Sequence, residues 1–275
     1  MLSPIRNCVL ATLIAAATFV SAHAALADDS MKIAIGQRGG WEQSVSELGQ
    51  NKGIFKKHGL TLDLFYTQGS AETLQSVLSN SVDIGIGLGT HSMLSAFLKG
   101  APIRGIGGSF TSADEQFYYV PADSAVRSMK DAGGKSIAIS TNGSASNMFA
   151  LHLARYFGVD LKPQPTGNYT ATLTQALTKQ VDIGFSAAPF NLNYVDEGKI
   201  RIVARGSEVP ALRDMTSRLI VVSASNLEKR REVLKRYMTA YLETLDWMYS
   251  DPAAIDAYAA PSRAARILVG LGFDE

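Results

Sequence analysis

The chain has 275 residues, of which 46% are hydrophobic and 19% are charged, with 26 basic and 25 acidic side chains. This length allows one large domain or two of ordinary size, and the hydrophobic fraction is sufficient for a buried core. The low charged fraction and near-zero net charge argue against a disordered chain and against a nucleic-acid partner.

Residues 1–27 have the three parts of a secretory signal peptide. Arg6 supplies the positive start, residues 9–20 form an apolar run, and an "ALA" tripeptide ending at Ala27 gives the small-residue cleavage pattern. We therefore expect cleavage near Ala27 and a periplasmic mature protein. Cleavage removes the single cysteine, Cys8, and leaves 25 basic and 25 acidic residues. The mature chain then has no thiol for a disulfide.

From residue 31 onward, short β-like runs alternate with amphipathic helical patterns. Strands are predicted at 31–36, 60–66, 82–88, 103–108, 135–140, 181–187, 199–205 and 218–224. Helices are predicted at 41–59, 70–80, 91–100, 144–158, 170–180 and 226–250. This alternation indicates βαβ units and mostly parallel sheets, an α/β fold class.

The phrase Val-Asp-Ile-Gly occurs twice, at residues 82–85 and 181–184. With an offset of 99 residues, segments 73–85 and 172–184 are identical at seven of thirteen positions. Two copies this far apart do not make a solenoid, whose periods are shorter, and they predict two similar α/β lobes. We expect Asp83 and Asp182 to hold the turn through backbone amides, without a catalytic role.

The loops that follow the predicted strands are rich in Gly, Ser, Thr and Asn. Ligands of open α/β sheets bind beyond the carboxyl ends of the strands, so two facing lobes predict a cleft lined by these loops. The loop "TNGSAS" at 141–146 opens a helix and presents backbone N–H groups suited to an anion. A helix cap without a ligand is the alternative interpretation of this loop.

Four phrases in the same order resemble the periplasmic substrate-binding proteins of the nitrate/sulfonate/taurine class of ABC importers. They are the first strand at 31–36, "NKGIFKKHGLTLDL" at 51–64, "SVDIGIGLGTHS" at 81–92 and "MKDAGGKSIAISTNGSAS" at 129–146. The resemblance covers residues 31–250. It implies a two-lobed periplasmic-binding-protein type II (Venus flytrap) fold, each lobe a mostly parallel sheet flanked by helices.

The resemblance also implies a domain division and a mode of action. The first lobe is expected to comprise residues 28–112 and 214–275, and the second lobe residues 113–213, with crossovers near 109–120 and 204–217. The lobes are expected to close on a small-molecule solute and to deliver it to an inner-membrane ABC permease, the protein itself being a monomer without cofactor. Because such proteins usually continue for some tens of residues past the "GLGFDE" end, we expect a truncated chain.

A ligand-binding set follows from the same resemblance, matched position by position to the loops of both lobes. The set is Arg38, Trp41, Gln68, Gly69, Ser70, Thr90, His91, Ser109, Thr141, Asn142, Gly143, Ser144, Ser186, Ala187 and Pro189. Arg38 hints at an anionic solute, although it equally suits a solvent-facing position. Trp41 equally suits core packing, and His91 a surface position. The scattered histidines of the mature chain show no metal spacing, so no catalytic or metal-binding residue is assigned.

An enzyme is the main alternative, because related folds host thiamine-pyrimidine synthases and small dehydratases. A mature chain without cysteine lacks the Cys-rich motif of the pyrimidine synthases, and no catalytic motif is present, so we expect no enzymatic activity. A periplasmic ligand sensor is a second alternative. The solute stays open among a sulfonate, nitrate, a taurine-like compound, a carboxylate and a neutral heterocycle such as a thiamine or riboflavin precursor.

Overall fold

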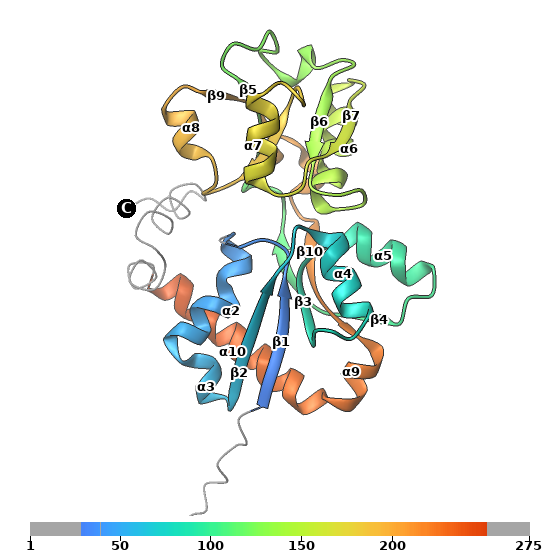
Figure 1. Ribbon diagram of the computed structural model, residues 1–275, viewed down its shortest axis with the longest axis vertical. Coiled ribbons are helices and arrows are strands. Elements are labelled where there is room, and N and C mark those ends of the chain that lie inside the picture. Colours follow the sequence, from blue (N-terminus) through green and yellow to red (C-terminus); the bar gives the residue numbers. More distant parts are fainter. Residues whose placement is uncertain (1–28, 39, 252–275) are drawn as a thin grey trace, which may run out of the picture.

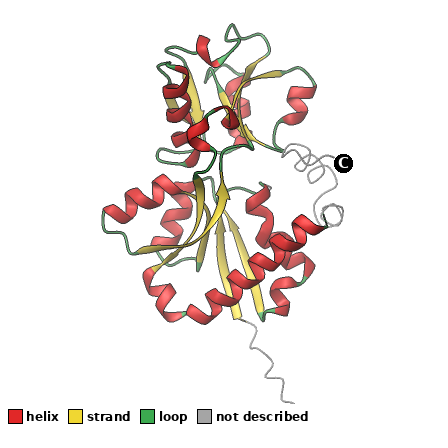
Figure 2. Ribbon diagram, turned by 180° about the vertical axis from the view of Figure 1, so that it is seen from behind, coloured by secondary structure: helices red, strands yellow, loops and turns green. Residues whose placement is uncertain are grey.

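The computed structural model describes residues 29–38 and 40–251, and the expected signal peptide lies outside these ranges. The described chain forms two α/β lobes, one above the other in Figure 1. Helices lie on both faces of the sheet in each lobe (Figure 2). The two-lobed α/β architecture expected from the sequence is therefore confirmed.

Among the described residues, the first lobe is built on a five-stranded sheet with the order β2-β1-β3-β10-β4. Its strands are β1 (Asp29–Ile35), β2 (Leu60–Tyr66), β3 (Ile84–Gly89), β4 (Ile103–Thr111) and β10 (Thr216–Ser223). β1 pairs in parallel with β2 and β3, whereas β10 runs antiparallel to β3 and β4. Its helices are α2 (Trp41–Lys52), α3 (Ile54–Lys57), α4 (Ser70–Leu78), α5 (Thr90–Leu98), α9 (Ala224–Lys229) and α10 (Arg231–Ser250).

The second lobe repeats this arrangement. Its strands are β5 (Gln116–Pro121), β6 (Ser136–Ile139), β7 (Lys162–Pro165), β8 (Gly184–Ala187) and β9 (Ile200–Arg205). β6 pairs in parallel with β7, β5 pairs antiparallel with β8 and β9, and a parallel bridge between Ile137 and Ile183 joins the two sets. The resulting order β7-β6-β8-β5-β9 has the same sequence of parallel and antiparallel neighbours as the first lobe. Its helices are α6 (Ala145–Phe157), α7 (Tyr169–Leu177) and α8 (Leu192–Asp196), with short 3-10 turns η2 (Met129–Asp131), η3 (Gly206–Glu208) and η4 (Pro210–Leu212).

Two connections join the lobes, and they lie side by side. The chain leaves the first lobe between β4 and β5 and returns between β9 and β10. The backbone N–H of Ser112 donates to the carbonyl oxygen of Met215 at 2.8 Å, and the Ser217 hydroxyl donates to the carbonyl oxygen of Phe110 at 3.3 Å. A paired double connection of this kind is a hinge geometry, in which few backbone angles need to change.

Two of the predicted helices are each divided in two. Gly53 has a φ of 83° and ends α2 in the left-handed region, which glycine adopts at no steric cost, and α3 then begins. Arg230, with φ of −121°, separates α9 from α10. Strands β5 and β7 and helix α8 were not predicted; β7 contains Pro163 and Pro165, which disfavour a strand except at a sheet edge, where β7 lies.

The repeated phrase places an aspartate in the same structural role in both lobes. The backbone N–H of Lys32, in β1, donates to Oδ2 of Asp83 at 2.8 Å, and that of Ser136, in β6, donates to Oδ2 of Asp182 at 2.9 Å. Each carboxylate thus ties the turn before one strand to the backbone of its parallel neighbour, in the middle of β1 and at the start of β6. The prediction that these aspartates bind backbone amides is confirmed.

The repetition extends beyond the phrase itself. Hydroxyls of Thr67 and Thr73 lie 2.7 Å apart, and those of Thr166 and Thr172, each 99 residues later, lie 2.6 Å apart. Both pairs are buried, and each connects the loop after a strand to the helix that follows it. The two lobes therefore share the details of the loops that follow β2 and β7 as well as their strand order.

Replacing the first aspartate is expected to cost more stability than replacing the second. Asp83 also accepts from Nη1 of Arg230 at 2.6 Å and its side chain is 17% exposed, whereas Asp182 is 41% exposed, with Nζ of Lys135 at 3.4 Å. Asp83→Ala should lower the free energy of unfolding by about 2–3 kcal/mol and Asp182→Ala by about 1 kcal/mol. Urea denaturation of both variants checks this order, and equal losses would contradict it.

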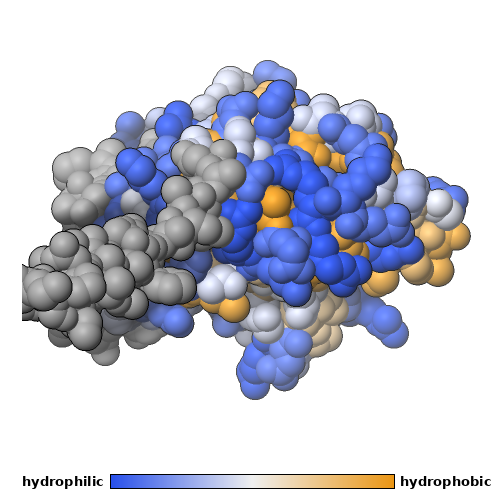
Figure 3. All heavy atoms as spheres, turned by 90° about the horizontal axis from the view of Figure 1, so that it is seen from below, coloured by the Kyte–Doolittle hydropathy of each residue, from blue (hydrophilic) through white to orange (hydrophobic). Residues whose placement is uncertain are grey.

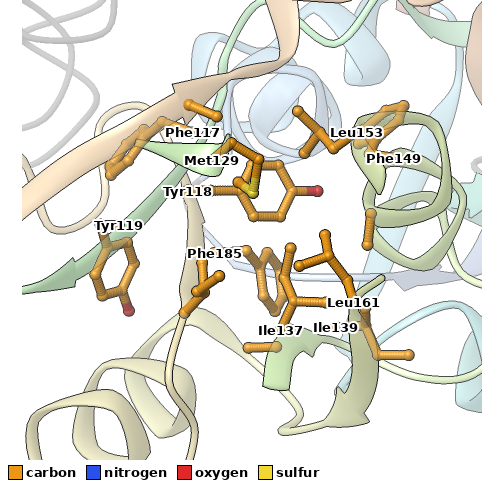
Figure 4. Close-up of a cluster of buried hydrophobic side chains, with 14 of the residues drawn as sticks. Phe117, Tyr118, Tyr119, Met129, Ile137, Ile139, Phe149, Leu153, Leu161 and Phe185 are labelled. Carbon is orange, nitrogen blue, oxygen red and sulfur yellow. The ribbon is translucent and has the colours of Figure 1, made fainter. Parts of the chain in front are cut away.

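Each lobe has its own hydrophobic core. In the second lobe, aromatic side chains of β5 lie in one cluster with Ile137 of β6, Phe149 of α6 and Phe185 of β8 (Figure 4). In the first lobe, Ile33 of β1 lies in a cluster with Tyr237 of α10. Burying each such side chain contributes roughly 1.5–3 kcal/mol, so the helices are held to the sheets mainly by these faces.

The outer surface of the first lobe has the opposite character. Seen from below, the described atoms are mainly hydrophilic, with smaller hydrophobic areas between them (Figure 3). Among residues 29–38 and 40–251, no helix combines the length and apolarity required to cross a bilayer.

Candidate ligand-binding site

A small cavity lies between the lobes at the ends of the central strands. The residues that line it are Gly36, Gln37, Gln43, Gly69, Ser70, Gly87, Gln116, Ser140, Ala145, Ser146, Tyr169, Phe185 and Arg218. Its volume is about 30 Å³, and one water molecule needs roughly 10–15 Å³ on the same measure. The lobes therefore stand close together, with room for only a small group between them.

In the described part of the chain, four helices begin at this cavity, two from each lobe. They are α2 and α4 of the first lobe and α6 and α7 of the second lobe, represented in the lining by Gln43, Ser70, Ala145 and Tyr169. A helix N-terminus presents unpaired backbone N–H groups and a partial positive charge. Their convergence makes the cavity rich in hydrogen-bond donors from both lobes.

A buried ionic cluster forms one wall of the site. Nη1 of Arg218, in β10, lies 3.0 Å from Oε1 of Glu42 in the first turn of α2 and 2.7 Å from Oε1 of Glu115. The three side chains are 8%, 6% and 4% exposed respectively. Because a guanidinium has five N–H donors and both ion pairs use Nη1, Arg218 keeps other donors for a solute in the cavity.

The cluster changes the acidity of its own members. Burial raises the pKa of Glu115 to about 7, with a further rise from Glu42, against the lowering effect of Arg218. Burial alone would lower the pKa of Arg218, but the two carboxylates outweigh it and raise that pKa. Arg218 is therefore charged throughout the physiological range, whereas Glu115 titrates within it.

The amide of Gln116 is a further polar group in the lining. Gln116 is 1% exposed, and its Nε2 has no hydrogen-bond partner among the described residues. A buried amide without a partner costs about 1–3 kcal/mol unless another group accepts from it. This cost points to a solute atom that accepts a hydrogen bond inside the cavity.

Direct contacts cross the cleft around the cavity. Nδ2 of Asn168 donates to Oε1 of Gln68 at 2.7 Å, and the hydroxyl of Ser92 donates to the carbonyl oxygen of Gly143 at 2.5 Å. At Gly89 the lobes approach so closely that a Cβ there would lie 2.7 Å from the backbone nitrogen of Ala145. The structure is therefore a closed form of the two lobes.

An outer depression adjoins the inner cavity. It has a volume of about 280 Å³ and is lined by Gln37, Arg38, Tyr66, Thr67, Gln68, Asn168, Tyr169, Thr170 and Phe190. The two spaces share Gln37 and Tyr169, so a solute can extend from one to the other. Nη2 of Arg38 lies 2.8 Å from Oε1 of Glu47, and its guanidinium lies 4.9 Å from the centre of the Tyr66 ring.

Seven of the fifteen residues predicted to bind ligand line one of three hollows: the inner cavity, the outer depression or a groove beside α4 and α5. Those in the inner cavity are Gly69 and Ser70. Those in the outer depression are Arg38 and Gln68. Those in a groove beside α4 and α5 are His91, Asn142 and Gly143.

Three other members of the predicted set lie in the first lobe. Trp41 is buried in the first-lobe core. The Thr90 hydroxyl donates to the carbonyl oxygen of Thr216 at 2.5 Å. Ser109 lies in β4, and its hydroxyl is buried without a partner among the described residues.

The remaining members lie in the second lobe. The Thr141 hydroxyl is buried without a partner in the described chain, and the Ser144 hydroxyl caps α6 by accepting from the backbone N–H of Asn147. The Ser186 hydroxyl donates to the carbonyl oxygen of Phe190 at 3.0 Å. At the end of β8, Ala187 is buried, and the peptide bond preceding Pro189 is cis.

Sequence reasoning missed most of the cavity lining, including Gln43, Gln116, Ser146, Tyr169 and Arg218. Gln116 and Arg218 directly follow the two crossovers, so their position beside the hinge was the available signal. Gln43 lies in the first turn of α2, whose first residue, Trp41, was in the predicted set, and Ser146 ends the "TNGSAS" loop, of which the set included only residues 141–144. The helices, more than the loops before them, provide the walls.

No cluster of three or more His, Cys, Asp or Glu side chains with metal-binding geometry occurs among the described residues. No curated protein matches the sequence. Solved structures do match: the alkanesulfonate-binding protein SsuA from Xanthomonas axonopodis pv. citri bound to MOPS is 18% identical, with a TM-score of 0.73 over 88% of this chain and 83% of that one.

Two further structures are similar to the same extent. The periplasmic aliphatic sulphonate binding protein SsuA from Escherichia coli is 17% identical, with a TM-score of 0.68 over 90% of this chain and 84% of that one. A Candida albicans gene product described as having the generic periplasmic binding protein fold is 18% identical, with a TM-score of 0.71 over 90% and 81%. At these identities the likeness establishes the fold.

The chain thus has the periplasmic-binding-protein fold, with the type II arrangement expected from the sequence. Residues 47–255 match the family described as NMT1/THI5 like. The chain belongs to this family.

Proposed function

We propose that this protein is the extracytoplasmic solute-binding component of an ABC importer, and that its solute carries a small anionic group. The observation that carries the proposal is the convergence of four helix N-termini with Arg218 in one cavity. Such N-termini bind anions through backbone N–H groups, and an added guanidinium strengthens those hydrogen bonds. The protein acts by binding and release, without catalysis.

The charges of the cluster limit what the cavity accepts. Arg218 is already paired with Glu42 and Glu115, so the site holds no uncompensated buried cation. A dianion would need more positive charge than the lining supplies, and burying it unpaired is costly. A singly charged group such as a sulfonate, carboxylate or nitrate fits the site better.

The outer depression supports an organic substituent on that group. Tyr66, Tyr169 and Phe190 give it aromatic walls, and Arg38 lies at its edge. An anionic head in the inner cavity and a carbon-containing tail in the depression would use both spaces. The aromatic walls favour an organic sulfonate or carboxylate over nitrate, and two of the similar structures are sulfonate-binding proteins.

A thermal-shift screen at constant ionic strength tests the proposal. A ligand at 100 times its dissociation constant adds about 2.7 kcal/mol to stability, which raises the melting temperature by several degrees. We expect a saturable rise with one class of organic monoanion. Chloride and sulfate, in buffers of the same ionic strength, serve as controls for a general effect of salt on stability.

Gln116→Leu tests the role of the buried amide, because it removes the amide and keeps a side chain of similar volume. The variant should melt normally and lose most of the rise. A rise caused only by neutral heterocycles or by cations would overturn the anionic solute. No saturable rise with any member of the screen would count against the binding function.

A further inference from the structure

The ionic cluster at the hinge has an unbalanced composition. Two carboxylates, Glu42 and Glu115, share a single guanidinium nitrogen of Arg218, and all three side chains are less than a tenth exposed. The second carboxyl oxygen of Glu115, Oε2, is buried and has no hydrogen-bond partner among the described residues. With both carboxylates ionised, the cluster would carry an unpaired buried negative charge, which is strongly unfavourable.

The cluster is also placed where a lobe movement must affect it. Glu42 belongs to the first lobe, Glu115 directly precedes β5 at the first crossover, and Arg218 lies in β10 just after the second. The first crossover and the start of β10 belong to the two connections between the lobes, which form the hinge. The three side chains therefore join both connections to the body of the first lobe.

Groups from both lobes enclose the cluster. From the second lobe, the phenols of Tyr118 in β5 and Tyr169 in α7 lie near enough to interact electrostatically with Glu115 and Arg218. From the first lobe, the hydroxyl of Tyr241 in α10 donates to the backbone carbonyl oxygen of Glu42 at 3.4 Å. Because Tyr169 and Arg218 line the same cavity, parting of the lobes draws Tyr169 away and admits water to the cluster.

We infer that the lobes close with a proton on Glu115, and that opening the cleft releases this proton. As a neutral acid, Glu115 leaves one carboxylate, that of Glu42, to balance Arg218. In the open form, water solvates both carboxylates and Glu115 ionises at neutral pH. The inference rests on the proposed function only in taking the lobes to open and close, and it requires no solute.

The direction of the pH effect follows from linkage. Burial in the closed form raises the pKa of Glu115 to about 7 from an ordinary 4.5. The closed form therefore binds the proton more tightly, so closure is favoured below pH 7 and weakens as the pH rises from about 5 to about 7.5. If opening restores ordinary acidity, the open-to-closed ratio changes by up to roughly 100-fold across that window.

Fluorescence energy transfer across the cleft measures this ratio directly. Labels are attached at Gln75→Cys on α4 and Thr174→Cys on α7, both exposed positions on opposite sides of the cleft (Figure 1), in a chain with Cys8→Ser. Transfer is recorded without solute from about pH 5 to about pH 9. Gly89→Ala, which places a methyl group against Ala145, gives the reading of an opened cleft.

Two variants distinguish the effect of titrating Glu115 from the effects of other titrating groups. Glu115→Gln mimics the neutral acid, and Glu228→Gln removes the same charge from an exposed site. We expect transfer to fall as the pH rises from about 5 to about 7.5 in the parent and in Glu228→Gln, and to stay high in Glu115→Gln. A parent signal that does not change with pH, or an equal fall in Glu115→Gln, would overturn the inference. A failed anion screen would leave this result intact.

Discussion

An Arg218→Met substitution is expected to lower the free energy of unfolding by about 3–5 kcal/mol, because it leaves two buried carboxylates without their partner. Arg218 and Glu115 are 8% and 4% exposed, so neither water nor another side chain readily replaces the lost ion pairs. The loss should be larger at pH 8 than at pH 5, where protonation of Glu115 removes part of the unpaired charge. Urea denaturation at both pH values measures it.

Two controls accompany this measurement. Arg213→Met removes the same charge from an exposed position before β10 and should change stability by less than about 0.5 kcal/mol. Combining Arg218→Met with Glu42→Gln and Glu115→Gln removes all three charges and should recover most of the loss. If the free energy of unfolding of Arg218→Met alone lies within about 1 kcal/mol of the parent value, the cluster is not a coupled ionic unit.

A Gly89→Ala substitution is expected to hold the cleft open while each lobe stays folded. The backbone at Gly89 has φ of −56° and ψ of 130°, which alanine adopts without strain, so the added methyl acts only through its neighbours. The nearest of these is the backbone nitrogen of Ala145, 2.7 Å away in the other lobe, which cannot move aside as a flexible side chain can. Overpacking of this kind costs about 1–3 kcal/mol, which weakens solute binding by about 5- to 150-fold.

Small-angle X-ray scattering and binding measurements with the most stabilising anion of the screen check this expectation. The radius of gyration should rise in Gly89→Ala and the dissociation constant should increase. Gly133→Ala is the matched control, because no atom outside its chain neighbours lies within 4 Å of the added Cβ. A variant that binds as the parent does would show that the lobes tolerate a wider spacing at this contact.

Local sequence patterns predicted the fold well where the chain is regular. The alternation of strands and helices, together with the phrase repeated 99 residues apart, predicted two lobes. It also predicted that Asp83 and Asp182 bind backbone amides. The division of the first helix at Gly53 was not predicted, because the apolar face of α2 continues into α3 across the left-handed turn. The strand β7 was missed because two prolines in four residues oppose strand formation, and only its parallel pairing with β6 compensates.

The cavity could be predicted only in part, for a physical reason. Gly69 and Ser70 were found because they follow a strand directly, and the rule for strand ends applies within one lobe. Gln116 and Arg218 reach the cavity through the hinge, whose geometry depends on how two sheets pack together. The ionic cluster joins residues up to 176 positions apart, and nothing local marks them as partners.

The strand order of the first lobe also determines when that lobe can be completed. β10 lies between β3 and β4, yet it is made about a hundred residues after them. The second lobe, from β5 to β9, is one continuous stretch and can form its own sheet as soon as β9 has emerged. The first lobe must keep a gap beside β3 and β4 until β10 arrives, so a chain that is still being synthesised has only its second lobe able to fold.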